Sequence, residues 1–243
     1  MVPVIHKLKK KLVSLFFDDM RSSFAQSGED IIIADLFTRL GIAKPTYLDI
    51  GANHPVALSN TYRLYKKGSS GVCIEPNPVL YKKILSKRSS DICINAGVAF
   101  DERREADYYV FSAGAHGFNT FSKTEADFWE HTGTESLGKF KVDRIVKTQL
   151  IDVNEVIEKY FRPHPNLISI DVEGLDLAII KTIDFDKYKP EVFCVETLGY
   201  SAADKETKNY DVVNFFIDKG YFVYADTYIN TIFCLRDAYK NLA

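Results

Sequence analysis

Residues Tyr47–Pro55 read YLDIGANHP, and this stretch decides the fold. Its apolar half predicts a buried strand, and Gly51 permits the tight turn that leads from the strand into a helix. In an open α/β sheet, ligands bind beyond the carboxyl ends of the strands, and free amides at a helix start favour an anionic group. The turn therefore predicts a ligand site. It differs from the G-x-G-x-x-G dinucleotide fingerprint, because Asn53 stands at the second glycine position.

Further apolar runs of strand length follow, with helical patterns between them. Their continuous hydrophobicity and this alternation predict a mostly parallel sheet with helices on both faces. Two final runs, Tyr221–Ala225 and Thr231–Leu235, flank a short polar turn and predict an antiparallel hairpin. The predicted parallel strands are Thr46–Ile50, Gly71–Glu75, Ile92–Ala96, Leu167–Asp171 and Glu191–Glu196; the predicted helices are Ser59–Lys67, Pro78–Arg88, Asn154–Phe161, Leu175–Ile183 and Lys205–Lys219.

Residues 100–150 are too many for one crossover between the third and fourth strands. Ala106–Phe111 and Lys141–Gln149 predict extra strands, and the segment between them is rich in Gly, Thr and aromatic residues. A long insertion beside a ligand cleft is usually functional. We expect a cap or substrate loop whose aromatic side chains either stack on a ligand or pack the cap; these are Phe118, Phe121 and Trp129.

The composition is that of an ordinary globular protein: 243 residues, 46 % hydrophobic, 26 % charged, with a formal net charge of −2. This length fits one α/β domain, which we place at residues 24–243. The lack of a basic excess argues against a nucleic-acid partner. Four cysteines lie in apolar runs at spacings that match no zinc motif, which predicts buried thiols in a reducing compartment.

Residues 1–23 predict a basic amphipathic helix ahead of the domain. Its apolar stretch is too short for a membrane span, and no small-residue cleavage site follows it. The helix either packs on the domain or adheres to an anionic membrane surface. We therefore expect a cytoplasmic protein, with peripheral contact at the inner face of the membrane as the second possibility.

Acidic residues gather at one edge of the predicted sheet. Asp49 and Glu75 lie at the ends of the first two strands, and Glu75 stands where an acid accepts hydrogen bonds from the ribose hydroxyls of a bound adenosine. Asp171 and Glu173 follow the fourth strand, and Glu196 ends the fifth. A cleft lined in this way suits a cationic ligand, ribose hydroxyls or a divalent metal.

In combination, these segments resemble the FkbM family of S-adenosylmethionine-dependent methyltransferases, over residues 24–235. The resemblance implies an α/β, Rossmann-like class I methyltransferase fold, with a mostly parallel seven-stranded sheet, an antiparallel C-terminal hairpin and an insertion between strands three and four. It also implies methyl transfer, usually to a hydroxyl, in pathways for glycans, glycolipids or polyketides. The segments that carry it are FAQSGEDIIIADLF (Phe24–Phe37), the run Tyr47–Pro78, GFNTFS (Gly117–Ser122), ISIDVEGLD (Ile168–Asp176), KPEVFCVE (Lys189–Glu196) and GY before the final hairpin.

The family pattern also implies where the cofactor lies. One segment, around Gln26, would close over it; the acids there, Glu29 and Asp30, also suit a helix's first turn. The implied cofactor residues are Asp49, Gly51, Ala52 and Asn53 in the first loop, Glu75 and Pro76 at the ribose, Asn95 and Ala96 at the adenine, and Asp171 near the methionine portion.

Methylation of a hydroxyl needs a general base, or a metal that acidifies the hydroxyl. His54 follows the cofactor loop and is the first candidate base, although it also suits a structural bond within the loop. His116, in the insertion, is the second candidate. Asp171 would act directly or, with Glu173 and Glu196, hold a divalent metal; Glu173 alternatively caps the next helix.

Two other function classes stay open at this point. One is an NAD-dependent oxidoreductase, since Tyr62 and Lys66 have the Tyr-x-x-x-Lys spacing of short-chain dehydrogenases; they lie, however, on the wrong helix for that chemistry. The other is a non-catalytic binding module. The methyltransferase reading predicts a small-molecule or glycan substrate.

Overall fold

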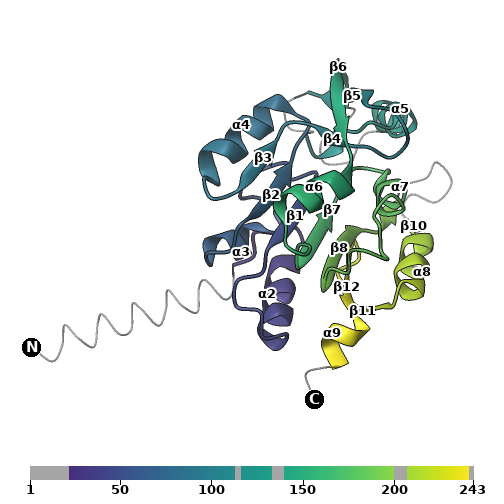
Figure 1. Cartoon of the computed structure of the whole chain (residues 1–243). Coiled ribbons are helices and arrows are strands. Elements are labelled where there is room, and N and C mark those ends of the chain that lie inside the picture. The colour runs from purple at the N-terminus through teal and green to yellow at the C-terminus, as the bar shows by residue number, and fades with distance from the viewer. Residues whose placement is uncertain (1–21, 113–115, 133–139, 200–206, 241–243) are drawn as a thin grey trace, which may run out of the picture.

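The computed structural model describes residues 22–112, 116–132, 140–199 and 207–240 (Figure 1). The predicted helix over residues 1–23 falls almost entirely outside these ranges, so it stays a prediction, as does its membrane contact. Within the ranges, every helix is too short or too polar to span a bilayer.

One seven-stranded sheet organises the described residues, in the order β11-β12-β8-β7-β1-β2-β3. Neighbouring strands are parallel except where β12 pairs antiparallel with β8 and β11. This confirms the expected class I methyltransferase architecture, with its reversed final strand. The strands are β1 (Tyr47–Ile50), β2 (Gly71–Ile74), β3 (Ile92–Ile94), β7 (Leu167–Ile170), β8 (Val192–Glu196), β11 (Tyr221–Asp226) and β12 (Asn230–Leu235).

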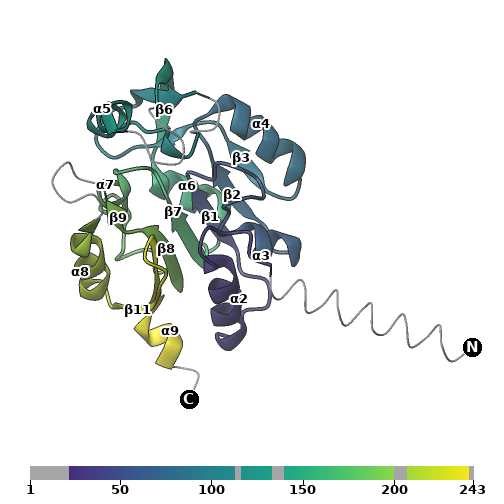
Figure 2. The same ribbon diagram turned by 180° about the vertical axis from the view of Figure 1, so that it is seen from behind.

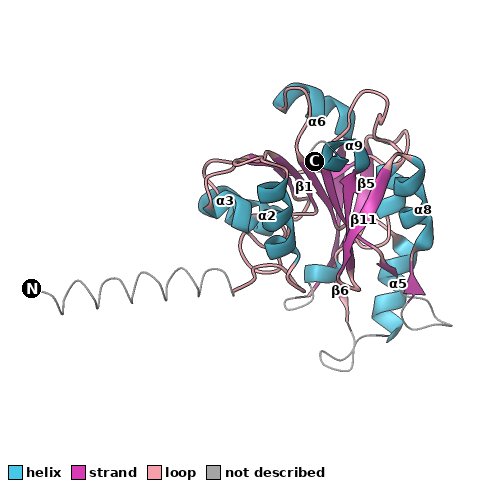
Figure 3. Ribbon diagram, turned by 90° about the horizontal axis from the view of Figure 1, so that it is seen from below, coloured by secondary structure: helices cyan, strands magenta, loops and turns pink. Residues whose placement is uncertain are grey.

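Helices cover both faces of the sheet because both faces of its strands are apolar. Along β1, Tyr47 joins one buried cluster and Leu48 the other. The two layers are seen from behind in Figure 2 and along the sheet in Figure 3. The first layer contains α2 (Glu29–Arg39), α3 (Tyr62–Lys66) and α4 (Pro78–Lys87); the second contains α6 (Val153–Tyr160), α7 (Asp176–Ile180) and α8 (Tyr210–Asp218); α9 (Arg236–Lys240) follows β12.

The insertion between β3 and β7 forms a small separate sheet in the order β4-β6-β5. Figure 1 shows it beyond the carboxyl ends of β1, β2 and β7, as a cap requires. Its helix α5 was not predicted, because Gly, Thr and aromatic residues mask its periodicity. Its elements are β4 (Gly97–Val98), β5 (Glu105–Phe111), the 3-10 helix η1 (His116–Phe118), α5 (Lys123–Thr132) and β6 (Val142–Ile151).

Three predicted helices are shorter in the structure. Helix α8 begins only after Asn209, whose side chain accepts a hydrogen bond from the Val212 amide. The residues just before it form β10 (Thr207–Lys208), which pairs with β9 (Leu198–Gly199) instead of extending the helix. Helices α3 and α7 each have five residues. The four cysteines are free thiols; Cys73, Cys194 and Cys234 are buried as predicted, and Cys93 is half-buried.

Gly71 at the start of β2 has no room for a side chain, because an added Cβ would lie 2.1 Å from the Tyr47 carbonyl oxygen. We expect Gly71→Ala to lower the free energy of unfolding by about 1–3 kcal/mol, as overpacking does. Urea denaturation measures the effect. Gly199→Ala is the control, since its Cβ would meet only Thr207 at 3.6 Å; equal midpoints for the two variants would contradict the prediction.

Candidate active site

A cavity of about 330 Å³ lies between the carboxyl ends of the central strands and the insertion. Its volume falls in the usual range for small-molecule sites. Of the residues predicted from sequence, it is lined by Gln26, Gly51, Asn53, Glu75, Pro76, Ala96, Asp171, Glu173 and Glu196; the insertion adds Tyr108, Gly117, Phe118, Asn119 and Phe121.

The turn after β1 is where the backbone approaches most closely. Gly51 has φ +81°, and an added Cβ would lie 1.9 Å from the carbonyl oxygen of Asp171. The amides of Gly51 and Ala52 donate to the Ile74 carbonyl at 3.0 and 3.2 Å, and the Asp171 amide donates to Ile50 at 3.1 Å. These bonds lock the ends of β1, β2 and β7 together, so only glycine fits at this position.

Glu75 at the end of β2 is buried and faces the cavity. Its two carboxylate oxygens accept hydrogen bonds from the amides of Asn53 and Asn77, each at 2.7 Å. Burial raises the pKa of Glu75 to about 7, although the two amides act in the opposite direction. Each oxygen keeps a further lone pair. The carboxylate therefore has the position and the lone pairs that a pair of ribose hydroxyls requires, and its contact with a ribose stays a prediction.

Asn95 and Ala96, the predicted adenine residues, differ in position. Ala96 is buried and lines the cavity. Asn95 is exposed, and its Nδ2 donates to the backbone carbonyls of Glu75 and Pro76 at 2.8 and 3.0 Å. Asn95 therefore braces the chain that carries Glu75, and a direct contact between its side chain and adenine stays a prediction.

Asp49 does not line the cavity, in contrast to the other acids predicted for the cofactor site. Its side chain points to the α2–α4 side of the sheet, where its Oδ2 accepts a hydrogen bond from Thr61 at 2.5 Å. Arg88 Nη1 lies 3.7 Å from the same oxygen. Burial raises the pKa of Asp49, and Arg88 and Thr61 partly offset this. The structure thus places Asp49 beneath the cofactor loop.

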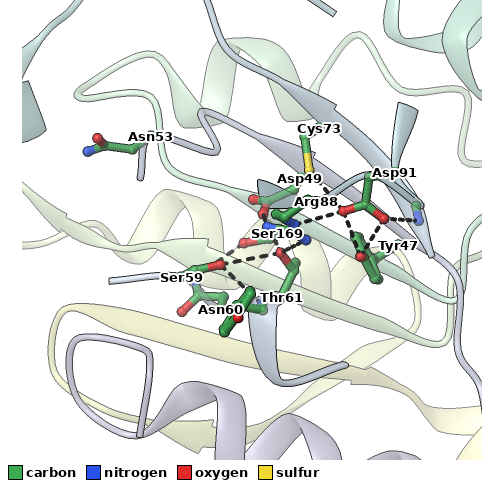
Figure 4. Close-up of polar contacts among 12 residues, drawn as sticks. Tyr47, Asp49, Asn53, Ser59, Asn60, Thr61, Cys73, Arg88, Asp91 and Ser169 are labelled. Carbon is green, nitrogen blue, oxygen red and sulfur yellow. Dashed lines mark hydrogen bonds and ion pairs between the residues drawn. The ribbon is translucent and has the colours of Figure 1, made fainter. Parts of the chain in front are cut away.

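Arg88 is the centre of this buried network (Figure 4). It is fully buried, with Nε 2.7 Å from Asp91 and Nη2 donating to Thr61 at 2.9 Å. Asp91 also accepts hydrogen bonds from the Tyr47 hydroxyl at 2.7 Å and the Gly71 amide at 2.9 Å. The network joins β1, β2, α3 and α4 below the site. Sequence reasoning missed it; its only signal was an Arg and an Asp three residues apart before the third strand.

His54 has a structural role in this geometry. Its Nδ1 accepts hydrogen bonds from the amides of Val56 at 3.2 Å and Ala57 at 2.9 Å. Burial and the nearby Lys83 lower its pKa. A neutral ring whose Nδ1 accepts bonds carries its proton on Nε2 and has no free lone pair for a substrate proton. Since His54 also lies outside the cavity lining, the structure favours the loop-fixing alternative. The side chain of His116 lies outside the described part.

Three carboxylates converge at the ends of β7 and β8. Ligand oxygens of Asp171, Glu173 and Glu196 all lie within 4.8 Å of one another. None of the three takes part in an ion pair with another described residue. Burial raises the pKa of Asp171 to about 6, and the charges of Asp49 and Glu29 add to the shift. Burial and then the charge of Asp171 raise the pKa values of Glu173 and Glu196 well above their usual range. The cluster can therefore bind a cation or accept a proton.

The loop after β7, which carries Asp171 and Glu173, has a strained backbone and a hydrogen bond to the insertion. Glu173 has φ +56°, an uncommon conformation for a residue with a side chain. Its carbonyl accepts a hydrogen bond from Thr120 Oγ1 of the insertion at 2.9 Å. The helix-capping alternative for Glu173 is wrong, because α7 begins after Leu175 and no side chain caps it; the Asp176 carboxylate accepts the Val172 amide at 3.2 Å. The insertion thus fixes the position of Glu173.

The Phe24–Phe37 segment forms another wall of the site. Glu29 and Asp30 do lie in the first turn of α2, but both are buried and partnered. Glu29 accepts hydrogen bonds from Thr227 at 2.6 Å and Asn230 at 3.1 Å, both at the final hairpin. Asp30 pairs with Arg63 at 2.9 Å. These contacts hold the preceding segment where Gln26 reaches the cavity.

The sequence of residues 49–223 matches the model of the methyltransferase FkbM domain. The chain belongs to the FkbM family of methyltransferases. No curated protein matches it. Among solved structures, it is similar to a putative RNA methyltransferase from Pyrococcus horikoshii (9 % identity, TM-score 0.40, covering 85 % of this chain and 82 % of that one). It is also similar to the 1,6-didemethyltoxoflavin-N1-methyltransferase of Burkholderia thailandensis, solved with 1,6-didemethyltoxoflavin and S-adenosylhomocysteine. Here the identity is 7 % and the TM-score 0.41, and the match covers 96 % of this chain and 87 % of that one.

Family and sheet topology together make this FkbM protein an S-adenosylmethionine-dependent methyltransferase. The residues present fit that cofactor. Glu75 offers lone pairs to the ribose, and the unpaired acids near Asp171 suit the cationic sulfonium and ammonium groups. Gly51 lines the same cavity at the turn after β1. The NAD-dependent alternative has no support in these findings.

Arg88→Met should destabilise the FkbM protein strongly. The change leaves Asp49 and Asp91 buried without their cation, which typically costs about 3–5 kcal/mol. Chemical denaturation measures the loss. Arg103→Met, which breaks the exposed pair with Asp101, is the control and should leave the midpoint unchanged. A loss for Arg88→Met no larger than that of the control would show that the network is not structural.

Stability of the ligand-free protein should fall as pH rises from about 5 to about 8. The pKa values of Asp171, Glu75 and Asp176 are raised to about 6, 7 and 8, so the folded state binds more protons than the unfolded state in this window. Urea denaturation across this range tests the slope. Glu173→Gln should reduce the dependence of the unfolding free energy on pH, and exposed Glu102→Gln should leave it unchanged. The same dependence in the wild type and both variants would refute a contribution of the carboxylate cluster.

Proposed function

We propose that this methyltransferase transfers the methyl group of S-adenosylmethionine to a hydroxyl of a sugar, a glycan or a related natural product. The observation that carries the proposal is the carboxylate cluster of Asp171, Glu173 and Glu196, which lines the cavity without a described cationic partner. A hydroxyl attacks poorly until its proton is removed, and this cluster places proton acceptors in the cavity.

The chain's residues hold the cofactor from two sides. Glu75 accepts hydrogen bonds from the ribose hydroxyls, with Asn53 and Asn77 fixing its orientation. The cluster around Asp171 faces the cationic end. When bound, S-adenosylmethionine supplies a methyl group activated by its sulfonium. Since that group is already a strong electrophile, positioning by the protein provides much of the rate.

Asp171 is the proposed general base. Its pKa of about 6 is the lowest that the cluster shows, so it is ionised at neutral pH and still basic enough to accept a hydroxyl proton. Burial and the negative charge of Asp171 also raise the pKa values of Glu173 and Glu196, so the cluster holds protons more readily than exposed carboxylates do. A divalent metal held by the same three carboxylates is the alternative that their chemistry permits.

The lining of the cavity favours a neutral acceptor. Its acids repel an anionic substrate, and one ring of the insertion, Phe118, lines it and can pack on the face of a sugar. Trp129 packs the interior of the cap, which is the second role predicted for the aromatic residues of the insertion. It is buried and packs with Phe118 and Phe140 inside the insertion, so it supports the cap.

A radiolabelled methyl-transfer screen over neutral glycosides, glycolipid fragments and nucleotide sugars tests the proposal. We expect label in an ether linkage of a sugar. Asp171→Asn should lower the transfer rate at saturating S-adenosylmethionine about 10²–10⁴-fold, the usual contribution of a general base. S-adenosylhomocysteine affinity, measured in parallel, separates this loss from any weakening of cofactor binding. Exposed Asp143→Asn on β6 is the matched control and should keep full activity.

The same experiment separates the alternatives. Label on nitrogen or carbon would replace hydroxyl methylation, and loss of transfer with a chelator would shift the cluster's role to metal binding. Calorimetry with S-adenosylhomocysteine and NAD provides the cofactor control. Full activity of Asp171→Asn would end its candidacy as the base, and cofactor binding with no transfer to any acceptor would favour a binding module.

A further inference from the structure

The insertion brings one unsatisfied polar group into the cavity. Asn119 lies between η1 and α5, is 6 % exposed and lines the cavity. Its Nδ2 is buried and forms no hydrogen bond of good geometry to a described residue; Tyr108 is its polar neighbour, and an amide nitrogen has two hydrogens to donate. A buried donor without a partner is costly in the folded protein, so a ligand that supplies an acceptor would relieve this cost.

The orientation of this amide is fixed by the protein. Asn119 Oδ1 accepts a hydrogen bond from the Phe111 amide at 2.8 Å. The next residue, Thr120, forms a backbone bridge with Tyr109 and bonds to the Glu173 carbonyl. Because the oxygen of the amide is occupied by the backbone, the group that remains for a ligand is a donor.

Asn119 has neighbours on the adenosine side of the site. The side chain of Tyr108 lies beside it: burial raises the pKa of Tyr108 first and Glu75, the ribose carboxylate, next, while a hydrogen bond with Asn119 lowers it and Glu173 adds a smaller increase. Two residues further along, Phe121 fills the space above Gly97, where an added Cβ would lie 2.4 Å from its ring. Gly97 directly follows Ala96 at the predicted adenine subsite.

An adenine ring matches these surroundings. It is flat and apolar on its faces, which suits Phe121, and its ring nitrogens are hydrogen-bond acceptors. We propose that Asn119 Nδ2 donates a hydrogen bond to a ring nitrogen of the adenine, so that the insertion supplies a base-recognition group to the cofactor site. This inference rests on the proposed use of S-adenosylmethionine.

Calorimetry with S-adenosylhomocysteine and with adenosine tests the inference without any methyl acceptor. Asn119→Ala and Asn119→Asp should each weaken both ligands about tenfold or more. Asn119→Asp retains the oxygen that accepts from Phe111, so it removes the donor while keeping the loop contact. Ser122→Ala, a neighbour outside the cavity lining, is the control and should bind normally. Thermal unfolding verifies that each variant is folded.

Adenosine analogues with one ring nitrogen replaced by C–H identify the acceptor atom. One of the 1-deaza, 3-deaza and 7-deaza compounds should lose affinity for the wild type and show no further loss with Asn119→Asp. Unchanged affinity of both Asn119 variants, or equal losses for all analogues in every protein, would overturn the inference. No binding of S-adenosylhomocysteine to the wild type would instead overturn the proposed function itself.

Discussion

The whole site depends on one steric constraint: no side chain fits between the end of β1 and the end of β7. The Asp171 carbonyl occupies the space that a Cβ on Gly51 would need, and the adjoining amides bond to Ile74. β1 stands between β2 and β7, where successive connections run to opposite sides of the sheet. Close contact at this point brings Glu75 and Asp171 to the same cavity from separate strands.

Two buried charge systems flank this contact, and they differ in what balances them. On the α2–α4 side, the carboxylates of Asp49 and Asp91 share the cation of Arg88. On the cavity side, Asp171, Glu173 and Glu196 have no such partner among the described residues. Because Arg88 neutralises the first system from within the protein, that system has a structural role. The second is completed by whatever enters the cavity, which is why we place the chemistry there.

Much of the fold was predictable because it is encoded locally. Continuous apolar runs identified the central strands, and the polar turn before Thr231 identified the final hairpin. Residues that meet the ligand through strand ends, such as Glu75 and Asp171, were also predictable, since parallel strands align their carboxyl ends. Asp49 shows the limit. Its position in the motif was correct, but alternation along β1 directs its side chain to the same face as Tyr47, and the Arg88 that receives it there is distant in sequence.

Other parts depended on contacts that no local pattern reports. His54 has the residue type of a base, yet two backbone amides occupy the nitrogen that a base would use. Asn119 carried no signal of its own, because its significance arises from the bond to Phe111 that leaves only a donor free. The α8 boundary was missed because the β9–β10 pairing competes with the helix.

The hydrogen bond from Thr120 to the Glu173 carbonyl makes the insertion a mechanical part of the carboxylate loop. The same short segment also carries Asn119 and Phe121 into the cavity. A chimera that receives the insertion of another family member would therefore exchange more than a substrate lid. Donor affinity, base placement and acceptor range would change as one unit, so engineering of acceptor preference in this scaffold is better directed at single side chains than at whole-loop exchange.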